Sequence, residues 1–275
     1  MKNSHQIYLI SDSTGETINR IFMALKAQFV NFEYELNQFS FTRTENQILN
    51  ILEQAKKAEN SIILYTIVNS KLAKFLADQS QKKNIPCFGV LGDLILNFSK
   101  TLNQKASHEP SGQHILNEEY YDRIEAIQFT MNHDDGNQIR DIEKSDIILL
   151  GVSRTSKTPT SIYLANRGYK TSNIPLVNEN SVPDKILKKD FSPCIVGLVT
   201  EAERLYDIRK NRLTSIKEDK NTEYINIDEI RYELENSKKI FKNNRWPTID
   251  VTRKSVEETA ASVIKIYEIK NKKNG

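Results

Sequence analysis

Short apolar segments alternate with amphipathic ones along most of this chain, and this alternation restricts the fold more than any other feature. Residues 6–11, 61–68 and 146–150 are short and mostly aliphatic or β-branched, as buried strands are. After the first of them, residues 16–29 place Ile18, Phe22 and Leu25 on one helical face. Strands that alternate with helices in this way predict an α/β fold with parallel sheets.

The chain is long enough for two such units. It has 275 residues, and domains usually contain about 100–200. A polar stretch after residue 102 indicates a linker. We therefore predict an N-terminal α/β domain at residues 1–104. Residues 105–275 are predicted to hold the linker, a middle helix and a nucleotide-binding domain, whose kinase-like parallel sheet is flanked by helices. Residues 39–42 and 174–177 are predicted as further strands.

Composition excludes several classes of protein. The 39 basic and 36 acidic residues give a net charge of +3, which is too balanced for a protein that coats nucleic acid. Cys87 and Cys194 are far apart and lack metal-site spacing, so reduced thiols in a cytoplasmic protein are expected. No apolar stretch reaches the ~18 residues of a membrane span, and the short apolar run at the N-terminus does not suit a signal peptide.

A phosphate-binding loop is predicted directly after residues 146–150. Gly151 follows that strand at once, then come five residues, then Lys157-Thr158 and a helix. The loop consists of Gly151, Val152, Ser153, Arg154, Thr155, Ser156, Lys157 and Thr158. In such loops, backbone amides and the positive end of a helix hold phosphates. The lysine reaches the terminal phosphates, and the hydroxyl of Thr158 suits a Mg²⁺ ligand.

One position departs from the usual pattern. Ser156 stands before the lysine, where a glycine is common because the backbone there often has a positive φ. The alternative interpretation is an ordinary strand-to-helix turn with a chance lysine.

A pair of carboxylates precedes the loop. His133-Asp134-Asp135-Gly136 closes the predicted middle helix, residues 118–131. Asp134 and Asp135 could supply a general base or hold Mg²⁺. Alternatively, Gly136 is the C-cap of the middle helix and both acids are solvated.

The first strand ends in small polar residues. Asp12, Ser13 and Thr14 follow it where parallel strands usually present ligand sites, so they are candidate contacts for phosphate or a partner. The alternative is that Ser13 or Thr14 caps the next helix.

Three arginines share one charged helix, predicted at residues 201–217. Arg204, Arg209 and Arg212 lie within an arc of roughly 140°. They could close over phosphates, as lid arginines do. The alternative is a solvated helix face.

Several segments together resemble one family. Residues 10–17 (ISDSTGET), 121–124 (YDRI), 133–136 (HDDG), 151–164 (GVSRTSKTPTSIYL), 204–209 and 246–260 are similar to the pyruvate, phosphate dikinase regulatory proteins. The similarity spans nearly the whole chain, and Ser156 matches this family's version of the loop.

The resemblance implies a bifunctional enzyme. It would phosphorylate a threonine beside the catalytic histidine of the dikinase with ADP as phosphoryl donor. It would also remove the phosphoryl group with inorganic phosphate, releasing pyrophosphate. Lys157 with Asp134 or Asp135 would be catalytic, Mg²⁺ would assist, and a homodimer fits the family.

Three other functions stay open at this point. A sister branch of the same family acts on phosphoenolpyruvate synthase by the same chemistry. A P-loop kinase that acts on a small molecule would carry a similar loop and similar arginines. A non-enzymatic ADP sensor would explain why no clear second acidic motif follows an apolar strand.

Overall fold

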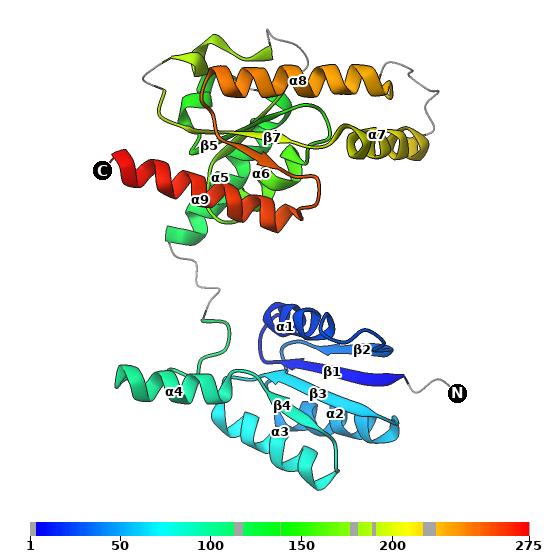
Figure 1. Ribbon diagram of the computed structural model, residues 1–275. Coiled ribbons are helices and arrows are strands. Elements are labelled where there is room, and N and C mark those ends of the chain that lie inside the picture. Colours follow the sequence, from blue (N-terminus) through cyan, green and yellow to red (C-terminus); the bar gives the residue numbers. More distant parts are fainter. Residues whose placement is uncertain are drawn as a thin grey trace. The chain divides into compact units, whose positions relative to one another are not determined.

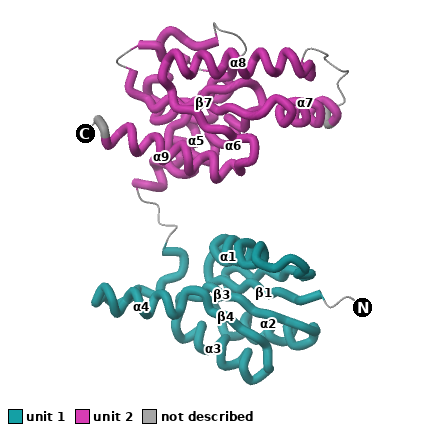
Figure 2. Tube along the Cα trace, viewed as in Figure 1, with its two compact units in different colours: residues 1–115 teal, residues 116–275 magenta. Residues whose placement is uncertain are grey.

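Two four-stranded parallel sheets, each flanked by helices, organise the chain (Figure 1). This confirms the predicted α/β fold. The computed structural model describes residues 4–112, 118–137, 139–176, 181–188, 191–216 and 224–274. The chain divides into two compact units, residues 1–115 and 116–275 (Figure 2). Among the described residues, none of the helices is both long and apolar enough to span a bilayer.

Unit 1 holds a sheet with the strand order β2-β1-β3-β4. Its strands are β1 (His5–Ser11), β2 (Tyr34–Phe39), β3 (Ser61–Thr66) and β4 (Cys87–Gly89). Its helices are α1 (Glu16–Lys26), α2 (Glu45–Lys57), α3 (Ser70–Lys82) and α4 (Gly92–Leu102). Along β1, Ile7 and Leu9 pack on the α1 side, while Tyr8 and Ile10 pack with α2 and α3. Both faces of the sheet are therefore covered.

Unit 2 repeats this architecture with the strand order β6-β5-β7-β8. Its strands are β5 (Ile147–Gly151), β6 (Thr171–Pro175), β7 (Cys194–Val199) and β8 (Thr248–Asp250). Its α-helices are α5 (Glu118–Asn132), α6 (Lys157–Ala165), α7 (Ala202–Ile216), α8 (Ile227–Asn243) and α9 (Val256–Asn274). The 3-10 turns are η2 (Asp134–Gly136), η3 (Ile139–Lys144) and η5 (Asp184–Leu187).

Strand β5 is central and fully buried, which explains its uninterrupted apolar sequence. Ile147 and Leu149 pack with α6 and α9 on one face of the sheet. Ile148 and Leu150 pack with Phe241 of α8 on the other face. Because β5 is clamped on both faces and between β6 and β7, the loop that leaves its carboxyl end starts from a rigid position.

Two strand predictions had the wrong bounds. The second strand lies at Tyr34–Phe39 and not at residues 39–42. It is an edge strand with polar exposed positions, so its sequence lacks an apolar run. Strand β6 begins at Thr171, whereas residues 174–177 were predicted, because its polar first half is buried and hydrogen-bonded. Residue 177 lies outside the described residues, and so does residue 217 of the predicted arginine helix.

Candidate functional site

The predicted phosphate loop leaves the carboxyl end of β5 and leads into α6. Gly151 is the last residue of β5. A Cβ atom there would lie 2.6 Å from Oγ1 of Thr155 and 2.8 Å from the carbonyl oxygen of Leu198. Only glycine fits this position, because one of the two clashing atoms belongs to the backbone of the neighbouring strand.

Two non-glycine residues of the loop adopt the left-handed backbone region. Arg154 has a φ of 74° and Ser156 a φ of 60°. Ser156 is also the N-cap of α6, although its side chain makes no capping hydrogen bond. The position where related loops carry glycine thus does have a positive φ, at a cost of about 1–3 kcal/mol. Such strain persists only where the surrounding structure enforces it.

The amides of this loop point to no internal partner. Among the residues that the structure describes, none accepts a hydrogen bond from the backbone N–H of Ser153, Arg154, Thr155, Ser156, Lys157 or Thr158. The first turn of α6 contributes the last of these donors and the positive end of its dipole. Successive unpaired amides at a helix N-terminus form a ready anion site.

Lys157 is nearly buried beside these amides. Its side chain is 5% exposed, and its Nζ donates to the carbonyl oxygen of Val152 at 3.0 Å. Burial lowers the pKa of Lys157 to about 8, while the negative charges of Asp135 and Asp134 act in the opposite direction. The same carbonyl accepts from Oγ1 of Thr155 at 2.9 Å. The ammonium group therefore has no carboxylate in ion-pair contact within the described chain and is suited to an incoming anion.

The first acid of the predicted pair lies against the loop. Oδ1 of Asp134 accepts a hydrogen bond from Oγ1 of Thr158 at 3.0 Å and another from Nδ2 of Asn173. Asn173 is fully buried on β6, and its Oδ1 accepts from the backbone N–H of Asp135 at 3.0 Å. Asn173 thus holds the turn that contains Asp134 and Asp135. In this way Asp134, 24 residues before Thr158 in the chain, reaches the loop.

The second acid is the more open of the two. Asp135 is exposed, has a φ of 50°, and its carboxylate receives no hydrogen bond from any described residue. The interpretation of Gly136 as the C-cap of the middle helix is wrong, although Asp135 is solvated as that interpretation expected. Helix α5 stops at Asn132, and Asp134–Gly136 form a separate 3-10 turn.

His133 belongs to the core and not to the reactive face. Its ring is 3% exposed and stacks on Phe129 with the ring centroids 3.8 Å apart. Its Nδ1 lies 2.8 Å from the carbonyl oxygen of Phe129, so Nδ1 carries the proton and donates it. The imidazole therefore fixes the start of the acidic turn.

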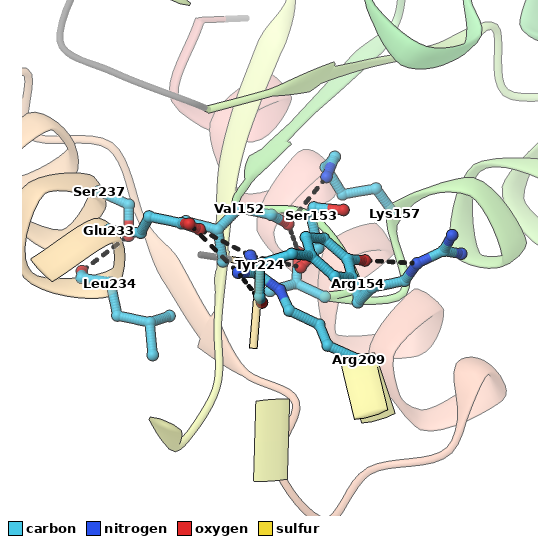
Figure 3. A network of polar contacts seen from close by, with 10 residues as sticks. Val152, Ser153, Arg154, Lys157, Arg209, Tyr224, Glu233, Leu234 and Ser237 are labelled. Carbon is cyan, nitrogen blue, oxygen red and sulfur yellow. Dashed lines mark hydrogen bonds and ion pairs between the residues drawn. The ribbon is translucent and has the colours of Figure 1, made fainter. Parts of the chain in front are cut away.

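A buried ion pair braces the loop from the other side (Figure 3). Arg209 of α7 is 1% exposed and donates to both carboxylate oxygens of Glu233 on α8, at 2.6 and 3.1 Å. It also donates to the carbonyl oxygen of Ser153 at 3.4 Å. The interpretation of Arg209 as part of a solvated helix face is wrong, because its neighbours Leu205 and Leu213 are buried on the same side.

Tyr224 connects the ion pair to the strained part of the loop. Its ring lies under the guanidinium of Arg209, 4.7 Å from the centroid, and its carbonyl oxygen accepts from that guanidinium at 3.3 Å. The Tyr224 hydroxyl accepts from Nε of Arg154 at 3.3 Å. Arg154 is thus held at the surface beside the loop. Arg204 of the same helix is exposed, and no described contact brings it to the loop.

Oxygen atoms suited to Mg²⁺ meet at the loop. Among the described residues, no three histidine, cysteine, aspartate or glutamate side chains gather as a metal cluster. The hydroxyl of Thr158 and the carboxylate of Asp134 nevertheless touch. Mg²⁺ commonly takes one or two such protein ligands together with phosphate oxygens of a substrate. These two residues therefore fit a cation that arrives with a nucleotide.

The polar end of β1 forms a separate pocket in unit 1. This pocket has a volume of about 270 Å³ and includes Asp12, Ser13 and Thr14 in its lining. Asp12 is buried, and its Oδ2 accepts from the amide of Val68 at 2.7 Å. Neither Ser13 nor Thr14 caps α1, because the N-cap is Gly15 and no side chain bonds there. A phosphate or partner contact at these residues stays a prediction.

Three residues of the site were not found from the sequence. Asn173, Tyr224 and Glu233 lie far from the loop in the chain and join it only through the fold. The one available signal was the run Thr171-Ser172-Asn173, which is polar although it precedes an apolar segment.

Comparisons with known proteins agree on one family. A family model described as kinase/pyrophosphorylase matches residues 7–264. A protein of Pelagibacter ubique, named provisionally as a pyruvate, phosphate dikinase regulatory protein, is 67% identical over the full length of both chains. A protein of Sphingopyxis alaskensis with the same name is 44% identical over 95% of this chain and 96% of its own.

A sugar transporter subunit from Rhodobacter sphaeroides was among the solved structures that align. It covers 78% of this chain and 65% of its own, at 10% identity and a TM-score of 0.25. That score is too low to inform the fold.

Replacing Arg209 by alanine should destabilise unit 2 by about 3 kcal/mol, because Glu233 and the Ser153 carbonyl lose a buried cationic donor. The matched control is Arg204→Ala, an exposed position on the same helix, which should change stability by less than about 0.5 kcal/mol. Urea unfolding measures both. Equal stability of the two variants would show that the ion pair does not support the loop.

Proposed function

Because this chain belongs to the kinase/pyrophosphorylase family, we propose that it is a bifunctional regulator of pyruvate, phosphate dikinase. In one direction it transfers the β-phosphoryl group of ADP to a threonine of the dikinase and releases AMP. In the other, inorganic phosphate attacks the phosphothreonine and pyrophosphate leaves. A cytoplasmic location is part of the proposal. The observation that carries it is the row of amides from Ser153 to Thr158, from which no described residue accepts a hydrogen bond, with Lys157 beside them.

The loop supplies the binding and the charge stabilisation. The β-phosphate of ADP would accept from the loop amides, and Lys157 would turn from the Val152 carbonyl to the phosphate. Phosphoryl transfer depends mainly on position and electrostatics, so one arrangement can serve both directions. Mg²⁺, held by Thr158 and Asp134 together with phosphate oxygens, would neutralise negative charge on the transferring group.

The two carboxylates have different roles in this proposal. Asp134 is occupied by Thr158 and Asn173, so it positions the loop and the cation. Asp135 is exposed and receives no hydrogen bond from a described side chain, so it accepts the proton of the threonine hydroxyl. As that proton leaves, the bond from threonine oxygen to phosphorus forms and the bond to the AMP oxygen breaks. In the phosphate-dependent direction, Asp135 takes the proton of the attacking phosphate, whose oxygen bonds to the phosphorus. The bond from phosphorus to the threonine oxygen breaks, pyrophosphate leaves, and Asp135 passes the proton to the threonine oxygen.

The family description favours an enzyme over a non-enzymatic ADP sensor, and the relatives' names favour the dikinase over phosphoenolpyruvate synthase. Arg154 adds a further charge near the phosphates. Among the described residues, its guanidinium donates to the Tyr224 hydroxyl alone, which an anionic phosphate can replace.

Incubation with ADP and purified dikinase should yield AMP and phosphothreonine, and added phosphate should then yield pyrophosphate. Lys157→Ala should lower both activities together by about 10²- to 10³-fold, since one charged donor to the transferring group is lost. The control is Lys265→Ala, an exposed lysine of α9. Binding of ADP without turnover by the wild-type protein would support the sensor, and turnover with a small metabolite alone would support a small-molecule kinase.

Asp135→Asn should lower kcat by about 10²- to 10⁴-fold, as loss of a general base does. Asp134→Asn should instead raise the Mg²⁺ concentration needed for half-maximal activity. Steady-state kinetics across pH and Mg²⁺ concentration distinguishes the two. If Asp134→Asn abolished kcat while Asp135→Asn kept it, the two roles would be reversed.

The affinity for ADP should fall as pH rises above about 8, the pKa of Lys157 in the free protein. The phosphate of ADP favours the ammonium form of Lys157. Above this pH Lys157 is mostly neutral, so it must take up a proton when ADP binds. The dissociation constant should then rise by up to about tenfold per pH unit. Lys157→Arg stays charged and should give a flat profile between pH 8 and 10. Calorimetric titration measures both, and identical profiles would exclude Lys157 as the phosphate contact.

A further inference from the structure

A concave surface of unit 2 lies at the opposite end of its strands from the predicted phosphate loop. It is a groove of about 650 Å³, lined by the start of β7, the turn from α8 to β8, the last turns of α9 and the segment around residue 187. Its apolar lining includes Leu187, Phe191, Trp246, Ile266 and Ile269. Strand β7 has six residues, so the groove lies about 20 Å from the carboxyl edge of the sheet.

The charged residues known to line this groove are all basic. Among the described residues that line it, Lys188, Arg245 and Lys270 are the charged ones. Nζ of Lys270 donates to the carbonyl oxygens of Ser192 and Pro193, at 2.6 and 2.8 Å. Two carbonyls fix the ammonium group without cancelling its charge, and its third N–H is left for another acceptor.

The apolar side chains extend beyond the groove onto the surface. Leu187 is 46% exposed and Ile269 is 48% exposed, and both line the groove with the half-buried Trp246. The three cations come from three separate segments of the chain. A ligand that satisfies both features carries several negative charges spread along its length and at least one apolar group. An acidic peptide segment has this chemistry, whereas a single small anion would leave most of the rim unpaired.

We propose that this groove docks an acidic segment of the protein substrate, with one apolar side chain of that segment seated against Trp246. The proposal rests on the function given above, in which the substrate is a folded protein. A docking site remote from the loop raises the affinity for such a substrate without occupying the site of phosphoryl transfer. Charge complementarity along the rim favours acidic partners over others.

Trp246 is the single tryptophan of the chain and lines the groove, so its fluorescence reports occupancy directly. The probe is a short peptide of glutamate and leucine. It should shift the emission of Trp246. Replacing the glutamates of the peptide by lysine, or its leucines by serine, should abolish binding.

Arg245→Glu and Lys188→Glu in the protein should each weaken binding of the peptide about tenfold, as loss of an interfacial charge pair does. The matched control is Lys265→Glu on α9, which lies outside the groove. This variant should change the affinity for the peptide less than about twofold.

Arg245→Glu and Lys188→Glu should also raise the KM for the dikinase about tenfold and leave kcat and the KM for ADP unchanged. Lys270 is left intact because it holds two carbonyls of the groove. If wild-type protein failed to phosphorylate the dikinase, the proposed function would fall, and the peptide titration alone would decide the groove. If Arg245→Glu and Lys188→Glu both bound the peptide as tightly as the wild-type protein, the proposal would be overturned. Tighter binding of a single-stranded oligonucleotide than of the acidic peptide would overturn it as well.

Discussion

The ion pair between Arg209 and Glu233 is the interaction on which the shape of the phosphate loop depends. It crosses from α7 to α8 and reaches the Ser153 carbonyl, while Lys157 and Thr155 occupy the Val152 carbonyl. These contacts hold the two carbonyls, while no described residue accepts a hydrogen bond from the amides of residues 153–158. Two left-handed residues cost about 1–3 kcal/mol each, and the buried contacts around them offset that cost.

A second consequence follows from the burial of Arg209 and Lys157. Arg209 comes from α7 and Lys157 from the loop, and the fold brings them to the carbonyl oxygens of Ser153 and Val152, respectively. Burial makes the ammonium of Lys157 easier to deprotonate, as its lowered pKa shows. In the proposed function, an anion at the loop accepts hydrogen bonds from amides that no described residue engages, and it pairs with the Lys157 ammonium. This is the physical basis of the proposed phosphate binding.

Local features of the site could be predicted from the sequence, and distant ones could not. The order strand, Gly151, Lys157-Thr158, helix is a property of neighbours in the chain, and the structure contains it. The contact between Asp134 and Thr158 depends on Asn173, whose place is set by the pairing of β6 with β5. Arg209 was predicted either to close over phosphates or to lie on a solvated helix face, and its burial beside the loop was not predicted because charged residues dominate its segment. No pattern among neighbouring residues in the sequence identifies Glu233 as the ion-pair partner of Arg209.

The central claim is that the amides after β5 and the ammonium of Lys157 hold the terminal phosphate of ADP. The most direct measurement is a crystal structure of the protein with ADP and Mg²⁺. We expect the β-phosphate within hydrogen-bond distance of the amides of residues 153–158, and Nζ of Lys157 turned from the Val152 carbonyl to a phosphate oxygen. ADP bound elsewhere, with Lys157 still on that carbonyl, would contradict the account.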